Sequence, residues 1–258
     1  MPIATAPPRA SQVGSGRDPV IGATLPDGAG PDVRGRDYPV SMCASYGLDP
    51  RFTEAELLAE ADEAVLEGLR SWAEGNAGET LRPTGRNLRN LNPLLVDQDG
   101  EQMLQQAWWG YLVNGQPARF PSINTRSERL QDRPGGLRTR AIVPTTGWFE
   151  MQKPERVWHE FGLGAGVLFG MAAVTQRGRT PEGDAVTCYS IVMRPAPGHL
   201  AHLHDRVPVL IPPAFAADWL TGEPSRELID EALIAAASVD ERVAAVPKPD
   251  DKGDGMLF

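Results

Sequence analysis

The sequence has few cysteines and no long apolar run. Only two cysteines, Cys43 and Cys188, occur among 258 residues, and they lie far apart in the chain. Two distant thiols do not indicate a disulfide framework, so both are expected to be free, and a reducing cytoplasm is the expected location. No stretch of about 18 apolar residues is present, and residues 1–41 lack the apolar centre of a signal peptide. A membrane partner is therefore not expected.

Positive charge is also scarce. The formal net charge of -9 argues against a protein that coats nucleic acid through bulk charge. The arginines are unevenly spread, however, because six of them lie in residues 119–140 against Glu128 and Asp132. Such a strip could hold a few phosphates, or its arginines could pair with neighbouring acids on a solvated face. The sequence leaves both alternatives open.

Composition divides the chain near residue 41. Residues 1–41 are rich in Pro, Gly and Ala, carry balanced charge and show no apolar period, which is typical of a disordered leader. Residues 42–258 are expected to form one domain.

At Thr53 the stretch TEAE matches a capping box, and apolar residues then recur at three- and four-residue steps up to Trp72. This pattern predicts an amphipathic helix of about twenty residues.

The rest of the chain has mixed patterns. Residues 75–96 contain turn residues throughout and predict a loop. Short β-like runs separated by Gly and Pro follow at 107–113, 139–151, 156–163, 166–175, 187–193 and 207–211. Helical patterns return at 213–220 and 225–237. We therefore expect the α+β class, as a single domain with a mostly antiparallel, barrel-like β core and flanking helices.

Titratable residues stand in two of these runs. In GWFEM, Glu150 is either a rim residue paired with an arginine or an acid/base group whose pKa is raised by burial. The segment PGHLAHLHDRVPVLIPP holds His199, His202 and His204. A structural metal site is one interpretation, but no acidic or cysteine ligand motif accompanies the histidines. A proton-carrying His204 is the other interpretation, and we favour it.

Two further stretches are ambiguous. In INTRSE, alternate positions would put Asn124, Arg126 and Glu128 on one side of an extended segment, which would suit either an anion-binding site or an exposed strand face. In AWWG, Trp109 is either part of the core or a stacking platform, and core is the commoner case. Cys188, within TCYSIVM, is expected to be a small buried apolar residue in a strand.

The order of these motifs resembles a known family. The order is similar to that in the SRAP family (SOS response-associated peptidase), DNA-repair proteins that crosslink to abasic sites. The motifs, in chain order, are Met42-Cys43, WG, P-x-I-N-x-R-x-E, GWFE and LHDRVPV. The resemblance runs from Met42 to about Leu220. It implies that catalytic groups fall on Cys43, Asn124, Glu150 and His204, and that DNA contacts fall on Arg126, Arg206 and Trp109.

The resemblance also implies a reaction and a partner. Cys43, once it is the first residue, would capture the aldehyde of an abasic site in single-stranded DNA through its amine and thiol as a thiazolidine, with a possible lyase reaction. The protein would act as a monomer, and neither a cofactor nor a metal is expected. Cys43 would become the first residue if translation begins at Met42 and that Met is removed, or if a leader is cleaved.

Two other functions remain open from the sequence. One is a cysteine autopeptidase, in which Cys43 attacks the peptide bond before it and releases the leader. The other is a non-catalytic module that binds single-stranded DNA and in which Cys43 is incidental.

Overall fold

The computed structural model describes residues 45–58, 63–76, 91–118, 122–180 and 182–248. All of them belong to one compact unit, Val40–Phe258. The predicted leader of residues 1–41 and the predicted nucleophile Cys43 lie outside the described residues.

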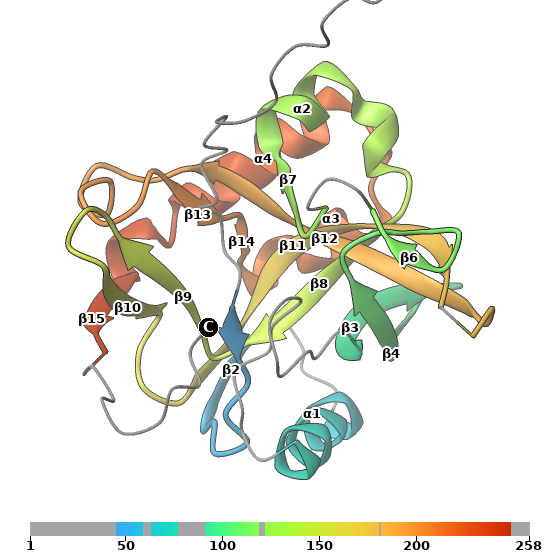
Figure 1. Ribbon diagram of the computed structural model, residues 1–258, viewed down its shortest axis with the longest axis horizontal. Coiled ribbons are helices and arrows are strands. Elements are labelled where there is room, and N and C mark those ends of the chain that lie inside the picture. The colour runs from blue at the N-terminus through green and yellow to red at the C-terminus, as the bar shows by residue number, and fades with distance from the viewer. Residues whose placement is uncertain (1–44, 59–62, 77–90, 119–121, 181, 249–258) are drawn as a thin grey trace, which may run out of the picture. The chain divides into compact units, whose positions relative to one another are not determined.

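The centre of the unit is a nine-stranded sheet in which five strands close into a ring (Figure 1). The ring strands, in chain order, are β3 (Leu91–Gln98), β4 (Glu101–Trp109), β8 (Arg140–Thr145), β11 (Val167–Arg179) and β12 (Ala185–Pro195). Strand β12 closes the ring because it pairs antiparallel with β11 on one edge and parallel with β4 on the other. The expected α+β domain with a barrel-like, mostly antiparallel core is thus confirmed.

Shorter strands extend this ring and form two smaller sheets. The ring is joined by β2 (Glu54–Glu56), β7 (Asn124–Arg126), β13 (Arg206–Pro208) and β14 (Leu210–Ile211). A four-stranded sheet contains β1 (Tyr46–Gly47), β9 (Gly147–Gln152), β10 (Val157–Gly162) and β15 (Ala244–Pro247). A small hairpin pairs β5 (Leu112–Val113) with β6 (Gln116–Pro117).

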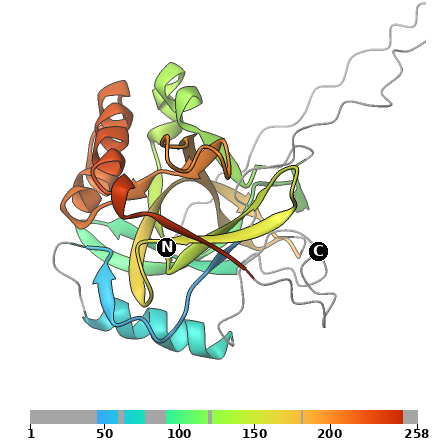
Figure 2. The same cartoon turned by 90° about the vertical axis from the view of Figure 1, so that its left-hand side faces the viewer.

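Helices flank the strands on opposite sides. The helices are α1 (Glu63–Gly75), α2 (Ser127–Asp132), α3 (Ala216–Thr221) and α4 (Arg226–Ala237), with short 3-10 helices η1 (Pro134–Leu137), η2 (Pro213–Phe215) and η3 (Asp240–Arg242). Figure 2 shows α1 on one side of the strands and α2 and α4 on the other. The expected late helices are confirmed, and the Ser225 hydroxyl caps α4 by accepting the amide of Leu228.

Three local expectations were wrong. The TEAE segment forms strand β2, not a helix start, because its backbone pairs with β11 and the amide of Thr53 donates to the Gly166 carbonyl. Helix α1 is described from Glu63 to Gly75. The expected loop up to residue 96 is a strand from Leu91 onward. The extended INTRSE segment ends at Arg126, so Glu128 lies on helix α2 instead of beside Asn124 and Arg126 on a strand.

The core has two parts, one on each face of the ring. Alternation along β8 shows the division, since Ile142 packs in one cluster while Ala141 and Val143 pack in the other. The first cluster contains the apolar faces of α1, α3 and α4. The second is rich in aromatic rings and includes Trp148 of β9 and Phe161 of β10. The four-stranded sheet is therefore attached to the ring through this second, aromatic cluster.

None of the described helices combines the length and apolar character that crossing a membrane would require.

Candidate active site

Glu150 and His204 meet between the two sheets. Glu150 lies in β9 of the four-stranded sheet, and His204 ends the connection that leads into β13 of the ring. The His204 Nε2 atom is 3.7 Å from the Glu150 Oε2 atom, and both side chains are 4% exposed. Two groups that stand 54 residues apart in the sequence are thus brought into one buried acid/base pair.

The environment of Glu150 favours its protonated form. Burial, and secondly the negative charge of Asp205, raise the pKa of the Glu150 carboxyl well above its usual value. Its Oε1 atom is buried and has no hydrogen-bond partner among the described residues. The arginine-paired rim position that the sequence left open does not occur within the described chain, and the acid/base interpretation fits the observed burial.

The His204 ring is oriented by the backbone of Arg206. Its Nδ1 atom lies 2.7 Å from the Arg206 carbonyl oxygen and 3.1 Å from the Arg206 amide nitrogen. The shorter contact suits an Nδ1–H that donates to the carbonyl, which leaves Nε2 to face Glu150 as an acceptor. The carboxylic acid and the imidazole can then exchange one proton over a short path.

The described chain begins at a strand directly beside Glu150. Tyr46 pairs with Trp148, and the carbonyl of Ser45 accepts the amide of Phe149 at 3.0 Å. The other end of β1 is held by the Gly47 carbonyl, which accepts the Thr145 hydroxyl at 2.8 Å.

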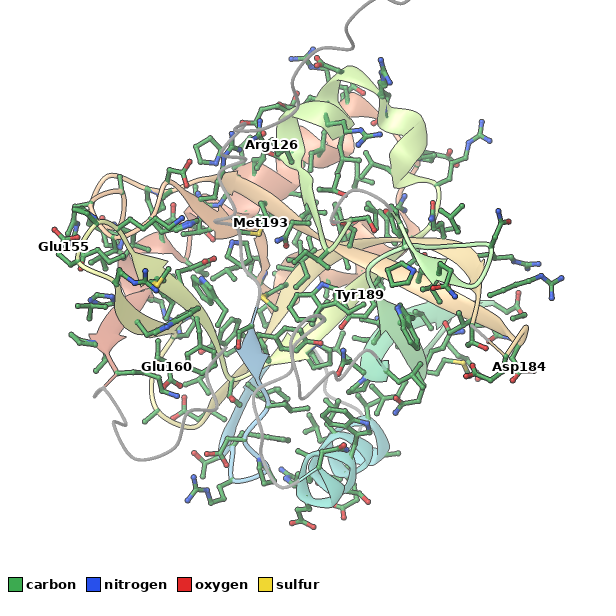
Figure 3. All side chains as sticks on the ribbon, in the orientation of Figure 1. Arg126, Glu155, Glu160, Asp184, Tyr189 and Met193 are labelled. Carbon is green, nitrogen blue, oxygen red and sulfur yellow. The ribbon has the colours of Figure 1, made fainter. Side chains whose placement is uncertain are left out.

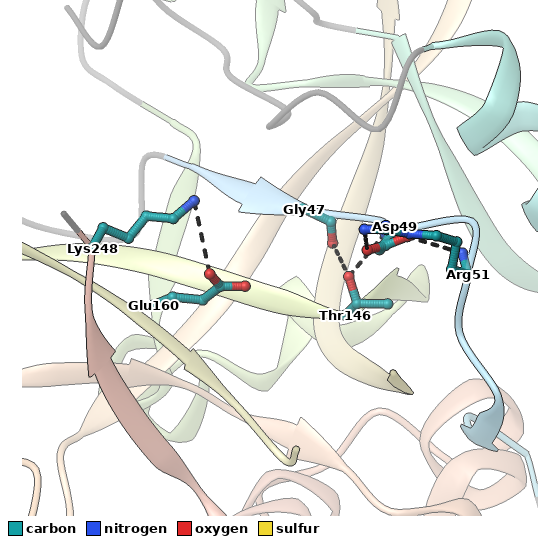
Figure 4. A network of polar contacts seen from close by, with 6 residues as sticks. All are labelled: Gly47, Asp49, Arg51, Thr146, Glu160 and Lys248. Carbon is teal, nitrogen blue, oxygen red and sulfur yellow. Dashed lines mark hydrogen bonds and ion pairs between the residues drawn. The ribbon is translucent and has the colours of Figure 1, made fainter. Parts of the chain in front are cut away.

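The turn that leaves β1 is fixed by a second threonine. The Thr146 hydroxyl contacts the Gly47 carbonyl at 3.4 Å and accepts the amide of Asp49 at 2.9 Å (Figure 4). Lys248 places its ammonium 4.2 Å from the centroid of the Phe149 ring and 3.7 Å from Glu160. Strand β1 is therefore held by β9 at its Ser45 end and by Thr145 and Thr146 at its Gly47 end.

A buried polar network lies under the site. The hydroxyl groups of Tyr46 and Tyr189 are 2.7 Å apart, and Asn92 Nδ2 donates to the Tyr189 hydroxyl at 2.9 Å. Trp109 packs between the two tyrosines, with ring centroids 4.9 Å from Tyr46 and 6.1 Å from Tyr189. Its indole donates to the Ile123 carbonyl, and the residue is only 1% exposed. Trp109 is thus a core residue. Its stacking on a DNA base stays a prediction, and the burial of its ring disfavours that role.

The residues expected to hold phosphates lie around β12. Strand β7 runs along one edge of β12, with Asn124 opposite Ile191 and Arg126 opposite Met193. Figure 3 shows Arg126 at the foot of α2 and Met193 below it. Asn124 is buried and Arg126 is exposed.

Arg206 is already paired within the protein. Its guanidinium Nη1 donates to both carboxylate oxygens of Glu128, at 2.7 and 2.9 Å. Burial opposes ionisation of Glu128, but hydrogen bonds from its own amide and from Arg206 outweigh this and lower its pKa. The pair ties helix α2 to β13, which begins two residues after His204.

The arginine strip of residues 119–140 divides into two kinds of residue. Arg140 is structural, because its guanidinium donates to the carbonyls of Leu137, Trp219 and Gly222. The other described arginines of the strip are exposed and form no ion pair with described residues; they are Arg126, Arg129, Arg133 and Arg138. Local pairing therefore does not account for these four.

The remaining histidines and the second cysteine do not join the site. His199 and His202 are exposed, and within the described ranges no group of three or more His, Cys, Asp or Glu side chains could hold a metal ion. Cys188 is fully buried in β12, and burial raises the pKa of its thiol. Its expected role as a small buried apolar residue is confirmed.

Sequence reasoning missed two neighbours of Glu150. His159 is 6% exposed and stands directly opposite Glu150 in the β9–β10 hairpin, while Asp205 contributes to the raised pKa of Glu150. The pairing of His159 with Glu150 could have been predicted from the sequence, because the two residues are equally far from the turn at 153–156. The effect of Asp205 on the pKa of Glu150 could not have been predicted, because it depends on how the connection before β13 folds.

Comparison with known sequences gives a family. The sequence model of "SOS response associated peptidase (SRAP)" matches residues 42–248. The "Abasic site processing protein YoqW" of Bacillus subtilis (strain 168) is 26% identical over 191 residues, which cover 69% of this chain and 80% of that protein. The "Abasic site processing protein YedK" of Escherichia coli (strain K12) is 32% identical over 140 residues, which cover 51% of this chain and 61% of that protein.

Comparison with solved structures supports the fold alone. A protein from Bordetella bronchiseptica aligns with a TM-score of 0.57 at 17% identity, over 80% of this chain and all of that one. A phage-related protein from the same organism aligns with a TM-score of 0.51 at 22% identity, over 80% of this chain and 94% of that one.

Proposed function

Because this chain belongs to the SOS response associated peptidase (SRAP) family, we propose that it processes abasic sites in DNA. Relatives from two bacteria carry the name abasic site processing protein. We further propose that the reaction is covalent capture of the abasic site in single-stranded DNA by Cys43, once Cys43 is the first residue of the chain.

The observation that carries the proposal is the buried pair of Glu150 and His204 beside the start of strand β1. Ser45 is hydrogen-bonded next to Glu150, through the amide of Phe149. A buried acid/base pair beside the first described strand supports a terminal cysteine as the nucleophile.

The chemistry needs both groups of a terminal cysteine. The open form of an abasic deoxyribose carries an aldehyde at its first carbon. The amine of Cys43 adds to this carbon, and loss of water gives an imine. The thiolate then forms a carbon–sulfur bond to the same carbon while the imine nitrogen takes up a proton, which closes a five-membered thiazolidine. The second attack is intramolecular and is favoured by proximity.

Glu150 and His204 would accept and donate the protons that are transferred in these steps. Once Glu150 has passed its proton to His204, the carboxylate is a stronger base than an exposed one because its pKa is raised, so it can accept a proton from the amine or the thiol and return it later. His204 would help to open the sugar and carry protons to and from its ring oxygen. Asn124 would hold the amine end and the hydroxyl of the opened sugar by neutral hydrogen bonds.

DNA contacts would flank this chemistry. Arg126 is exposed and available to a phosphate, whereas Arg206 would contact one from its position beside Glu128. Trp109 would act from beneath the site, through the Tyr46 and Tyr189 rings that it supports. We propose that a monomer is sufficient, since the groups invoked all belong to one chain.

The same imine permits strand cleavage. An imine at the first carbon acidifies the neighbouring C–H bond, and loss of that proton can expel the 3′ phosphate. Crosslinking and lyase activity would then be competing fates of one intermediate.

The terminal amine of Cys43 requires removal of residues 1–42. Translation from Met42 followed by loss of that Met would achieve this, and so would self-cleavage before Cys43 assisted by Glu150 and His204. The second candidate function, autopeptidase, rests on the 42 residues that precede Cys43 in this chain and on the family's peptidase description.

Intact-mass analysis tests the proposal. The chain beginning at Cys43 is mixed with single-stranded DNA that carries one abasic site, and an adduct equal to protein plus DNA minus one water is expected. Two controls are matched to it: Cys43→Ser, and the chain that retains residues 1–42 uncleaved. Both should bind the DNA without forming the adduct. No adduct from a verified Cys43 terminus would refute the covalent mechanism.

A further inference from the structure

His159 is a buried imidazole that the mechanism proposed above does not use. It lies in β10, directly opposite Glu150 of β9. The exposed fraction is 6% for His159 and 4% for Glu150. Because an imidazole gains or loses a positive charge near neutral pH, a buried one beside a buried carboxyl group can change how easily that carboxyl ionises.

Glu150 and His159 point to the same face of the four-stranded sheet. Directly opposite residues of an antiparallel pair share a face, with Cβ atoms about 4.5–5.5 Å apart. The neighbouring pair on this face, Trp148 and Phe161, has stacked rings with centroids 5.2 Å apart inside the aromatic cluster. The ring centroids of His159 and Phe161 are 6.4 Å apart. The face that carries Glu150 and His159 is therefore the one that the sheet turns towards the closed ring.

The His159 ring is held by the backbone of its own strand. Its Nδ1 atom lies 3.2 Å from the carbonyl oxygen of Val157. An Nδ1–H that donates to this carbonyl leaves Nε2 as the atom that takes up a proton when the ring becomes charged. The ring can thus change its charge without giving up this hydrogen bond.

The titratable groups that face Glu150 come from two elements. The connection before β13 supplies His204, whose Nε2 atom is 3.7 Å from Glu150 Oε2. The same connection supplies Asp205, whose negative charge adds to the effect of burial in raising the pKa of Glu150. Strand β10 supplies His159. On the other side of His159, strand β15 contributes Pro247, which carries no charge.

The charged side chains at the far edge of this sheet lie on its other face. Glu160 follows His159 along β10 and so points the opposite way, where it pairs with Lys248 at 3.7 Å (Figure 4). The Glu150 Oε1 atom, which is the oxygen that does not face His204, is buried and has no hydrogen-bond partner among the described residues. Within the described chain, the hairpin side of the Glu150 carboxyl is thus left to His159.

We propose that His159 is a positioning residue that controls the ionisation of Glu150. A protonated His159 places a positive charge beside Glu150, and an opposite charge within about 4 to 6 Å favours the ionised form of an acid. Burial of both groups strengthens the interaction, because the local dielectric is low. The carboxylate is the form that accepts a proton from Cys43 in the proposed reaction. His159 would therefore extend that reaction to lower pH, and in this respect its role rests on the proposed function.

Carbon NMR of the full chain tests this control without DNA. The protein is labelled with ¹³C at the side-chain carboxyl carbons of glutamate, and the Glu150 signal is the one that disappears in Glu150→Gln. The signal is followed from pH 4 to pH 9 in the wild type, His159→Asn and His159→Phe. Both His159 variants lack the positive charge, so the pKa of Glu150 should be higher in each of them than in the wild type.

The two variants separate the charge of His159 from its packing. Asn offers an amide N–H to the Val157 carbonyl in place of the Nδ1–H, whereas Phe keeps a ring of similar size and loses that hydrogen bond. A purely structural role would leave His159→Asn like the wild type and change only His159→Phe. His199→Asn is the matched control, because it removes an exposed histidine that does not join the site. It should leave the Glu150 signal unchanged.

The rate of adduct formation gives a second measurement. The chain beginning at Cys43 is mixed with excess single-stranded DNA that carries one abasic site, and the rate is measured at pH 5.5 and pH 8.5. Imidazoles ordinarily titrate near pH 6.5, so this interval changes their charge. Both His159 variants should be about tenfold slower than the wild type at the lower pH, where the charge is missing, and about equal to it at the higher pH.

The outcomes separate this role from the covalent mechanism. An unchanged titration of Glu150 in both His159 variants, a change in His159→Phe alone, or an equal change in His199→Asn would overturn it. A loss of rate that is the same at both pH values would also count against it. If the wild type forms no adduct at any pH, the covalent mechanism fails, and the titration of Glu150 still decides whether His159 controls its ionisation.

Discussion

At the scale of single residues, the position of Glu150 decides what its carboxyl group can do. Carboxyl groups are rarely this buried unless a cation accompanies them. Here the described neighbour is an imidazole, not a guanidinium. The sequence could place Glu150 at the end of an apolar run. It could not choose between a rim and a buried position, because burial depends on β1, β10 and the connection before β13 closing over β9.

The raised pKa of Glu150 predicts a pH-dependent cost in stability. Below the unfolded-state pKa of about 4.3, folded and unfolded chains both carry the proton and no cost arises. As the pH rises, the unfolded chain loses the proton first, so the free energy of unfolding falls until the raised folded-state pKa is passed. Glu150→Gln removes this titration. We expect the variant to match the wild type near pH 4 and to gain stability relative to it as the pH rises towards 8.

Denaturant unfolding at several pH values measures this difference. Glu155→Gln, on the exposed turn of the same hairpin, is the matched control and should show no such trend. A constant gap between Glu150→Gln and the wild type across this pH range would contradict the prediction.

At the scale of elements, strand β3 was missed although the sequence contains a signal for it. Asp99 and Gly100 form the turn between β3 and β4 with φ values of +58° and +87°. Asp-Gly between apolar runs favours a two-residue hairpin of this kind. The signal was obscured by the polar stretch before Leu91 and by Pro93 inside the strand. The burial of Leu94 and Leu95, one on each face of the ring, supplies the stabilisation that the local pattern lacks.

The positive φ in the β3–β4 turn predicts that alanine substitution has different effects on stability at Gly100 and at Gly198. A Cβ atom at Gly100 would meet nothing within 4 Å, but the positive φ disfavours any L residue other than Asn or Asp there. Gly100→Ala should therefore destabilise the protein by about 1 kcal/mol. Gly198→Ala is the matched control, because that site is equally open and lacks a positive φ. It should be neutral or slightly stabilising. Thermal unfolding measures both, and equal effects would contradict this explanation.

The hydroxyl pair beneath the site predicts coupling between β1 and β12. Tyr46→Phe and Tyr189→Phe each remove one side of the 2.7 Å contact. A buried hydrogen bond of this kind contributes about 1 kcal/mol, so the double variant should cost less than the sum of the single variants by about that amount. Chemical denaturation of the wild type and the three variants gives the coupling energy. Strict additivity would mean that the hydroxyl contact does not stabilise β1.

At the scale of the whole molecule, the fold class could be predicted from the sequence, but the side chains that come together in space could not. Short β-like runs with Gly and Pro between them predicted most of the strands, and the helical patterns at 213–220 and 225–237 predicted the late helices. The TEAE segment became a strand because pairing with β11 outweighed a local helix signal. The meeting of Glu150 with His204 likewise depends on pairings between distant strands. For Cys43, Asn124, Arg126 and Arg206, the roles stay predictions for the experiments above.

The closed ring has a consequence for the time at which the protein becomes reactive. Ribosomes add about 5 to 20 residues per second, so roughly 10 to 30 s separate synthesis of the chain near Ser45 from synthesis of His204. Strand β12, which closes the ring, and His204 both belong to the later part of the chain. A growing chain therefore displays its first strand long before the imidazole that faces Glu150 exists. On the mechanism proposed above, a nascent protein would be inert towards abasic DNA, and reactivity would begin only when synthesis is nearly complete.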